Sequence, residues 1–365
     1  MRQILFYAKH PKQIEANAKV LDTNFSKFAD IDVHSDKTVE SIELDVMTKV
    51  FSKKGWECHW TCLDWLNLGN GTIQFFEPFK QTTQTIKLNQ LSEDFTVIVF
   101  RIIGTVEGKR ALIDKAIDTL QGNFSGLLIN HPETMKYGIK KDYIMELQKN
   151  GFPVIPSRYF DTTVSYADLY KATDPTKEYI IKSITGELSN SFAKVENADC
   201  VKYYHKDSNT EVETEKVENG EQYLRRKENL IGGWLLQPYY KDILDEGEFQ
   251  LVFFRDTFSH GLKKTYKKQI GFDLPSQKQR EINLYNPTDE EIDLALRIKD
   301  FFEKILLKPI YTFRFDYLKL KNGEIKILEF EILNPGFFIG YLKDDESKFN
   351  VAHKFAVEIN RMLSK

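Results

Sequence analysis

The chain has 365 residues, which at roughly 150 residues per domain predicts two or three packing units. Hydrophobic residues make up 41% of the chain and charged residues 29%, which excludes global disorder. The 51 basic and 54 acidic side chains give a net charge of −3. Because no whole-chain cationic field favours nucleic acid or an anionic membrane, we expect neither as a partner.

The lengths of the apolar runs and the number of cysteines limit the cellular location that we expect. The longest early apolar run, Phe95–Phe100, is far shorter than the roughly 20 residues of a membrane-spanning helix, so we expect no span. Three cysteines cannot pair completely, which favours a reducing cytoplasm. Cys58, His59 and Cys62 have no fourth metal ligand nearby in sequence, so we interpret the two cysteines as buried thiols on a strand.

Strand and helix patterns alternate over the first third of the chain. Apolar periodicity predicts strands at Ile4–Tyr7, Trp56–Trp60, Val97–Phe100 and Leu127–Ile129, with helices at 42–51 and 107–122. This order predicts an open, largely parallel α/β sheet. The turn after the first strand has no glycine-rich phosphate motif, which disfavours a dinucleotide-binding domain.

Three further segments of the chain carry local structure signals. A helix predicted over Lys140–Gln148 ends at Asn150-Gly151, and a hinge between units is expected near here. Residues 205–229 are mostly polar and predict a solvated hairpin or loop. A capping box at Thr288–Glu291 predicts a helix that continues through Leu306.

The segment Tyr311–Gly336 is the most informative. Asn322-Gly323 is a strong signal for a two-residue hairpin turn. With that turn, Asp316 faces Glu329 and Arg314 faces Glu331. Period-two geometry puts these four charges on one face and a set of apolar residues on the other: Phe313, Phe315, Leu328 and Phe330.

Two opposed carboxylates are destabilising unless a positive charge lies between them. Mg²⁺ meets this need, because it takes carboxylate oxygens, an amide oxygen such as that of Asn334, and substrate phosphates. Two simpler alternatives remain open: the charges line the solvent face of an ordinary hairpin, or Arg314 alone neutralises its neighbours.

Five parts of the chain, taken in order, carry a family resemblance: Ile129–Pro132 with Lys141–Tyr143, Ile180–Lys182, Leu235–Tyr240, Glu246–Glu248 with Phe258–Lys264, and Asp316 with Glu331–Gly336. Together they resemble the ATP-grasp superfamily of carboxylate-amine ligases, and within it the glutathione-synthetase-like members of the cycloserine-biosynthesis cyclo-ligase subgroup. The resemblance extends from about residue 95 to the C-terminus.

The resemblance implies a fold and an activity. The fold is an N-terminal open parallel α/β (pre-ATP-grasp) domain at 1–130, followed by a two-lobed ATP-grasp domain with antiparallel sheets. Its lobes are expected at 131–236 and 237–365, the second with the metal site. The implied activity is that of a cytoplasmic, ATP- and Mg²⁺-dependent ligase. It joins a small-molecule carboxylate, an amino acid or short peptide, to an amine through an acyl phosphate. Relatives are often homodimers.

The resemblance also implies residue roles. Lys141, Lys182 and Lys264 would hold the nucleotide phosphates, Glu248 the ribose, and Asp316, Glu331 and Asn334 the metal. Pro238 has no N–H, so the Gln237 carbonyl and the Tyr239 amide would read the adenine edge. The two catalytic residues would be Lys264 and Arg314, the latter stabilising the oxyanion formed when the amine attacks.

Several assignments have alternatives. Lys140 competes with Lys141 and Lys263 with Lys264, while Asp242 and Asp245 compete with Glu248 for the ribose.

Other residues have a structural reading beside the functional one. Arg101 ends a predicted strand and either orients an acceptor carboxylate or forms a structural ion pair. We expect His260 to be structural, and residues 184–192 to form a lid. A small-molecule kinase and a non-catalytic ATP-binding protein are the alternative functions.

Overall fold

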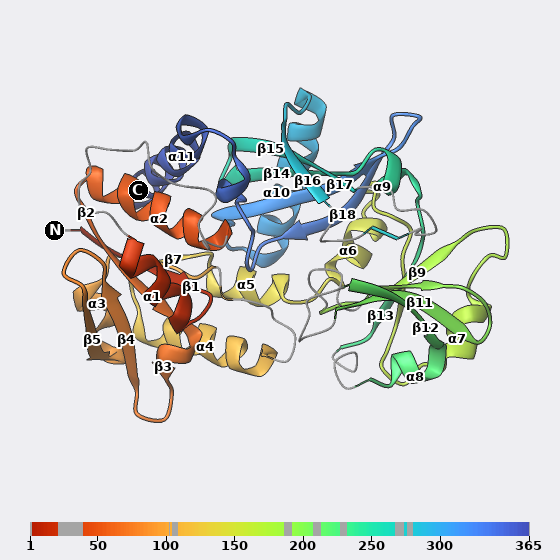
Figure 1. Cartoon of the computed structure of the whole chain (residues 1–365), viewed down its shortest axis with the longest axis horizontal. Coiled ribbons are helices and arrows are strands. Elements are labelled where there is room, and N and C mark those ends of the chain that lie inside the picture. The colour runs from red at the N-terminus through yellow and green to blue at the C-terminus, as the bar shows by residue number, and fades with distance from the viewer. Residues whose placement is uncertain are drawn as a thin grey trace.

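The computed structural model describes residues 2–20, 39–101, 103, 109–185, 192–206, 213–226, 232–266, 274–275 and 280–364. These residues form three β-sheets in chain order. In Figure 1 the first sheet lies at the left in red to orange, the second at the right in green, and the third between them in cyan to blue. No helix in the described ranges is long and apolar enough to cross a bilayer.

The first sheet has a parallel core and an antiparallel extension. Strands β2, β1, β6 and β7 pair in parallel, as the sequence predicts, whereas β3, β4 and β5 add an antiparallel meander that the sequence patterns did not predict. The strands are β1 (Arg2–Ala8), β2 (Trp56–Cys62), β3 (Leu66–Asn67), β4 (Thr72–Glu77), β5 (Thr82–Lys87), β6 (Val97–Val99) and β7 (Leu127–Ile129).

Helices cover both faces of this sheet because successive strand residues point to opposite sides. Even-numbered residues of β1 pack with α2 and α11, and odd-numbered ones pack with α4. In Figure 1 α11, at the end of the chain, lies beside α2. The helices are α1 (Pro11–Val20), α2 (Val39–Lys53), α3 (Leu91–Asp94), α4 (Arg110–Asn123) and α11 (Asp345–Leu363).

The second sheet is antiparallel throughout, in the order β12-β11-β10-β9-β13-β8. Of residues 205–229, where a solvated hairpin or loop is predicted, the end of β11 and the whole of β12 pair as antiparallel strands and α8 follows, while 207–212 and 227–231 lie outside the described residues. The elements are β8 (Arg158–Phe160), α7 (Tyr166–Lys171), β9 (Tyr179–Ser183), β10 (Phe192–Val195), β11 (Cys200–Lys206), β12 (Glu213–Asn219), α8 (Gly220–Leu224) and β13 (Trp234–Pro238).

The third sheet is also antiparallel, in the order β16-β15-β14-β17-β18, and α6 and α10 pack with one of its faces. The predicted capping box at Thr288 opens α10, and the helix ends at Leu306 as expected. The elements are α5 (Pro132–Gly138), α6 (Tyr143–Lys149), α9 (Asp242–Asp245), β14 (Glu248–Phe254), β15 (Thr257–Tyr266), β16 (Arg280–Tyr285), α10 (Asp289–Leu306), β17 (Thr312–Lys319) and β18 (Ile325–Glu331).

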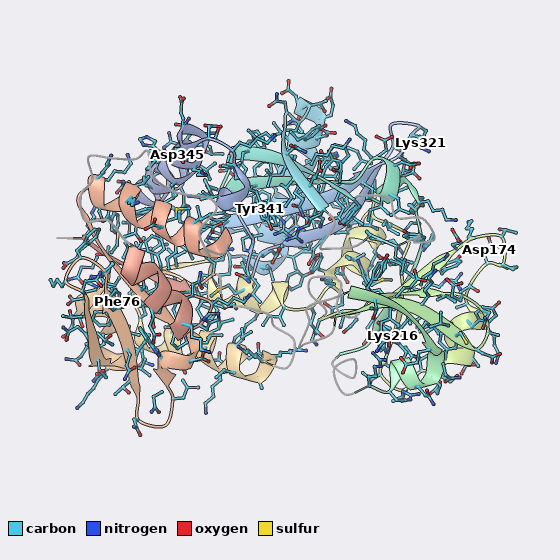
Figure 2. All side chains as sticks on the ribbon, in the orientation of Figure 1. Phe76, Asp174, Lys216, Lys321, Tyr341 and Asp345 are labelled. Atoms are coloured by element: carbon cyan, nitrogen blue, oxygen red, sulfur yellow. The ribbon has the colours of Figure 1, made fainter. Side chains whose placement is uncertain are left out.

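The hairpin of β17 and β18 differs from the prediction in its turn. Leu320 N–H donates to the Glu324 carbonyl, so the loop has three residues, and Gly323 adopts φ +85°. A bulge at Leu328 compensates for the extra residue. Figure 2 shows Lys321 at the outer tip of this loop.

The bulge restores the predicted pairs near the other end of the hairpin. Asp316 pairs with Glu329, and Arg314 with Glu331. The prediction for Leu328 is wrong: as the bulged residue it leaves the core face and packs beside Ile155 and Ile243. Phe313, Phe315 and Phe330 are buried in the core as predicted.

One asparagine joins the first sheet to the third. Asn130 follows β7 directly and is buried. Its Nδ2 donates to the carbonyls of Thr312 and Ile332, both at 2.6 Å, and its Oδ1 accepts from the N–H groups of Tyr311 and Thr312 at 2.7 Å. The amide therefore fixes the start of β17 and the end of β18 relative to the parallel strands.

Candidate functional site

A polar face lies on the third sheet, opposite the face that packs against α10. The pleat places alternate residues of β14 and β17 on this face, and the register brings those of neighbouring strands together. The residues gathered there are Glu248, Gln250, Lys264, Arg314, Asp316, Glu329 and Glu331. The sheet therefore brings together most of the predicted site.

Arg314 lies between two carboxylates. Its Nε and Nη2 donate to the two oxygens of Asp316, each at 2.8 Å, and Nη2 lies 2.6 Å from Oε2 of Glu331. Burial would lower the pKa of Arg314, but Asp316 and Glu331 hold it above its ordinary value. The guanidinium also lies 5.1 Å from the ring centroid of Phe338.

Asp316 receives a further hydrogen bond from β14. The Nε2 of Gln250 lies 3.2 Å from Asp316 Oδ2, whereas its buried Oε1 has no hydrogen-bond partner in the described part of the chain. Burial raises the pKa of Asp316 above its ordinary value, against the lowering effect of Arg314. Sequence reasoning missed Gln250, although its period-two spacing from Glu248 was a signal.

Two lysines reach this face from outside the third sheet. Lys141, just before α6, places its Nζ 3.1 Å from Glu329 Oε1, and this contact favours it over Lys140 as the lysine of this face. Lys182 lies on β9, and burial, reinforced by Lys141, lowers its pKa to about 8. Burial opposes ionisation of Glu329, but Lys141, Lys182 and Arg314 hold its pKa below its ordinary value. Lys182 of the second sheet therefore belongs to one charged cluster with Lys141 and with the acidic and basic residues of the polar face, namely Glu248, Lys264, Arg314, Asp316, Glu329 and Glu331.

Lys264 and Glu248 form a directly opposed pair on β15 and β14. Lys264 Nζ lies 2.6 Å from Glu248 Oε2, and the Tyr266 hydroxyl donates to Glu248 Oε1 at 2.5 Å. The competitor Lys263 points to the opposite face, over the Phe249 ring. This contact favours Lys264 as the lysine of the polar face.

The other ribose candidates have structural roles. Asp242 Oδ1 accepts from the N–H of Lys321, and Asp245 Oδ2 lies 2.7 Å from its Nζ. Both carboxylates therefore support the hairpin loop of β17 and β18, which leaves Glu248 as the candidate nearest the cluster.

The adenine-reading atoms that we expected are engaged in the second sheet. The N–H of Tyr239 donates to the Glu178 carbonyl, and that of Ile184 donates to the Gly233 carbonyl. In an antiparallel pair the backbone N–H and C=O groups of alternate residues point to the same neighbour, so those of the odd-numbered residues of β13 point to β9. By this alternation the Gln237 carbonyl also faces β9. The roles of Gln237 and Tyr239 in nucleotide binding stay predictions. Because the Gln237 carbonyl and the Tyr239 N–H are engaged with β9, we no longer assign the adenine contacts to these two backbone groups.

The side chain of Gln237 offers another group. It is buried, its Nε2 donates to Ser157 Oγ at 2.7 Å, and its Oε1 has no hydrogen-bond partner within the described residues. A ligand donor would satisfy this oxygen.

The carboxylates fit a magnesium ion in chemistry. In the described ranges no three His, Cys, Asp or Glu side chains form a group that could hold a metal as they stand. Asp316, Glu331 and Glu329 nonetheless lie within one charged cluster and are hard oxygen donors of the kind Mg²⁺ prefers, and the unpartnered Gln250 oxygen adds another. The family motif does not include Glu329 among the metal ligands, although the opposed carboxylates of the hairpin point to it. Asn334 lies in the segment after β18, and its role stays a prediction.

Arg101 and His260 show structural contacts. Arg101 forms a buried ion pair with Glu43. His260 Nε2 lies 2.8 Å from the Phe337 carbonyl, and burial lowers its pKa to about 4. Most of the predicted lid at 184–192, namely 186–191, lies outside the described residues.

The known proteins described below, which this chain resembles in sequence or fold, are at most 21% identical to it. No family model matches the chain. Among curated proteins, the cycloserine biosynthesis protein DcsG of Streptomyces lavendulae is 21% identical over 228 residues, which are 61% of this chain and 71% of the relative.

Three solved structures share the architecture. The crystal structure of the D-cycloserine synthetase DcsG has a TM-score of 0.65 at 15% identity and covers 99% of both chains. A Chryseobacterium gregarium RiPP-associated ATP-grasp ligase, in complex with ADP and a leader and core peptide, has a TM-score of 0.57 at 11% identity, over 98% of this chain and 97% of that one. D-alanyl-alanine synthetase A from Vibrio cholerae has a TM-score of 0.55 at 11% identity, over 98% of each. The chain therefore has the ATP-grasp fold, as its motifs predict.

Proposed function

We propose that this protein is an ATP- and Mg²⁺-dependent ligase that joins a carboxylate to an amine through an acyl phosphate. The observation that carries the proposal is the charged cluster on the third sheet. Asp316, Glu329 and Glu331 lie there with Arg314, and lysines from three separate parts of the chain converge on it.

The basic residues would bind and orient the nucleotide. Lys141, Lys182 and Lys264 would neutralise the phosphates, with Glu248 near the ribose and the Gln237 side chain near the adenine. Bound Mg²⁺, held by Asp316, Glu331 and Glu329 or Asn334, would supply neutralisation of charge as the γ-phosphate is transferred.

Arg314 would act in the second half of the reaction. The substrate carboxylate attacks the γ-phosphate and releases ADP, and the amine then attacks the acyl phosphate and releases phosphate. The Arg314 guanidinium is buried on the same face as the carboxylates that would hold the metal, so it would lie close enough to stabilise the oxyanion of that second step.

We propose amino acids or short peptides as substrates. Support comes from the solved relatives, whose names refer to D-cycloserine, D-alanyl-alanine and a leader and core peptide. The cytoplasm suits the three free cysteines, Cys58, Cys62 and Cys200. The homodimer and the division at residues 130 and 236 stay predictions.

The test is an ADP-release screen of the full chain with MgATP against amino acids and short peptides, singly and in pairs, with hydroxylamine as a trap. We expect one carboxylate to give ADP and a hydroxamate in the absence of amine, and a ligated product when the amine is supplied. ADP with a stable phosphate ester and no hydroxamate would instead show a kinase, and no binding of MgATP would refute the proposal.

A further inference from the structure

Arg101 makes contacts that reach from the first sheet into the segment after β18. The residue follows β6 and is only 4% exposed. Its Nη1 pairs with Glu43 of α2, and its Nη2 donates to the Pro335 carbonyl at 2.8 Å. The guanidinium lies 3.5 Å from the ring centroid of Phe337. One side chain therefore holds both the backbone and a ring of this segment.

The segment so held adjoins the candidate metal ligands. Glu331 ends β18, and Asn334 immediately precedes Pro335. On the other side, Gly336 lies so close to Arg314 that an added Cβ would stand 3.2 Å from its Nη1. In Figure 2 Tyr341, a few residues further on, lies near the centre of the molecule. A displacement of Pro335 would therefore move Asn334 on one side of it and Gly336, which lies against Arg314, on the other.

Glu43 compensates the positive charge of Arg101. A buried arginine near a cation site would repel the cation unless its charge were compensated. Burial lowers the pKa of Arg101, and Glu43 opposes this most strongly. The ion pair thus allows a guanidinium to hold the segment without adding net charge beside the site.

We propose that Arg101, paired with Glu43, is a positioning residue that sets residues 331–337 for binding of the magnesium nucleotide. This inference rests on the proposed function. Arg101 touches neither nucleotide nor metal in this scheme and acts through the Pro335 carbonyl and the Phe337 ring. His260 holds the Phe337 carbonyl from the third sheet itself, so Arg101 adds the tie to the first sheet.

Three variants of the full chain test the contact: Arg101→Gln, which removes the charge; Glu43→Gln, which leaves the arginine uncompensated; and Arg101→Lys, which keeps the charge but lacks the planar fork. Lys299→Gln is the matched control. Lys299 on α10 is as deeply buried, and it pairs with Glu303 of the same helix and with Asp256 between β14 and β15.

Two measurements are made on each protein. The first is hydrogen exchange at the amides of residues 336–341 without metal or nucleotide. The second is the Mg²⁺ concentration that gives half-maximal binding of a fluorescent ADP. We expect faster exchange in Arg101→Gln and Glu43→Gln, and a Mg²⁺ requirement raised about tenfold or more, as for loss of groups that orient metal ligands. Arg101→Lys should be intermediate and Lys299→Gln unchanged.

Unchanged exchange and Mg²⁺ requirement in Arg101→Gln would overturn the proposal. An equal rise in Lys299→Gln would also overturn it, because the effect would then be general loss of stability. If Arg101→Gln fails to fold, Arg101→Lys and Glu43→Gln decide by the same two readouts. Absence of Mg²⁺-dependent ADP binding in the unaltered protein would refute the proposed function, whereas the exchange measurement would still test the contact.

Discussion

Each carboxylate of the charged cluster already faces a basic group: Asp316 and Glu331 share Arg314, Glu329 lies against Lys141, and Glu248 against Lys264. In a magnesium nucleotide the metal is positive and the phosphates are negative. The metal can therefore replace a basic side chain beside a carboxylate, and a phosphate can replace a carboxylate beside a lysine, without leaving a buried charge uncompensated. The residue types were readable from the sequence. The pairing of Arg314 with Glu331 was also readable from the hairpin, whereas the pair of Glu329 with Lys141 and the role of Gln250 depended on segments that are distant in the chain.

Lys182 makes binding pH-dependent. Its lowered pKa, about 8, means that the ammonium loses its proton as the pH rises through that value. Phosphate needs the charged form, so we expect the affinity for MgADP to fall about tenfold between roughly pH 7 and pH 9. Binding titrations check this, with Lys182→Arg as the comparison because arginine stays charged. A parallel pH dependence in Lys182→Arg would remove Lys182 from the phosphate site.

Asp316→Asn should abolish turnover. The amide keeps the shape of the side chain but loses the negative charge that Mg²⁺ needs, so we expect ADP formation to fall at least about a hundredfold. Asp293→Asn, the same change on the exposed side of α10, is the control. Equal rates for Asp316→Asn and the unaltered protein would exclude Asp316 as a metal ligand.

At the scale of the element, the β17–β18 hairpin shows why a register can be predicted for the wrong reason. Asn322-Gly323 correctly located the turn, but the loop has one residue more than the two-residue type. The bulge at Leu328 cancels that residue, so the pairs Asp316–Glu329 and Arg314–Glu331 are confirmed. A bulge has no reliable sequence signal, because Leu328 suits the core as well as a satellite cluster.

Gly323→Ala tests the loop conformation. At φ +85° an alanine is strained, so we expect the free energy of unfolding to fall by roughly 1 kcal/mol. Gly122→Ala in α4, where an added Cβ meets no atom within 4 Å, should instead stabilise by a few tenths to about 1 kcal/mol. Chemical denaturation compares them, and stabilisation by Gly323→Ala would contradict the left-handed turn.

At the scale of the whole molecule, the parallel core and the ATP-grasp fold were predictable, because apolar runs and motif order are local features. The meander of β3–β5 was not, since β5 is mostly exposed and its Thr-rich sequence carries no core pattern. The ties between sheets were not predictable either. They rest on single polar side chains, Asn130 and Arg101, whose partners lie about 200 residues away.

Asn130→Ala should loosen the join between the first and third sheets. It removes four hydrogen bonds to buried or partly buried backbone groups, so we expect a loss of roughly 3 to 5 kcal/mol in the free energy of unfolding. Asn123→Ala, which removes one bond at the end of α4, should cost less than about 1 kcal/mol. Denaturation curves that fall together would contradict the proposed tie.

The proposed function requires that the acids and lysines of this cluster bind a metal nucleotide. The most direct measurement is a crystal structure of the full chain with Mn²⁺ in place of Mg²⁺ and with ADP, with the metal located by its anomalous signal. We predict the metal among the carboxylates of Asp316, Glu329 and Glu331, and the phosphates beside Lys141, Lys182 and Lys264. Nucleotide and metal bound elsewhere on the protein would contradict the proposed function.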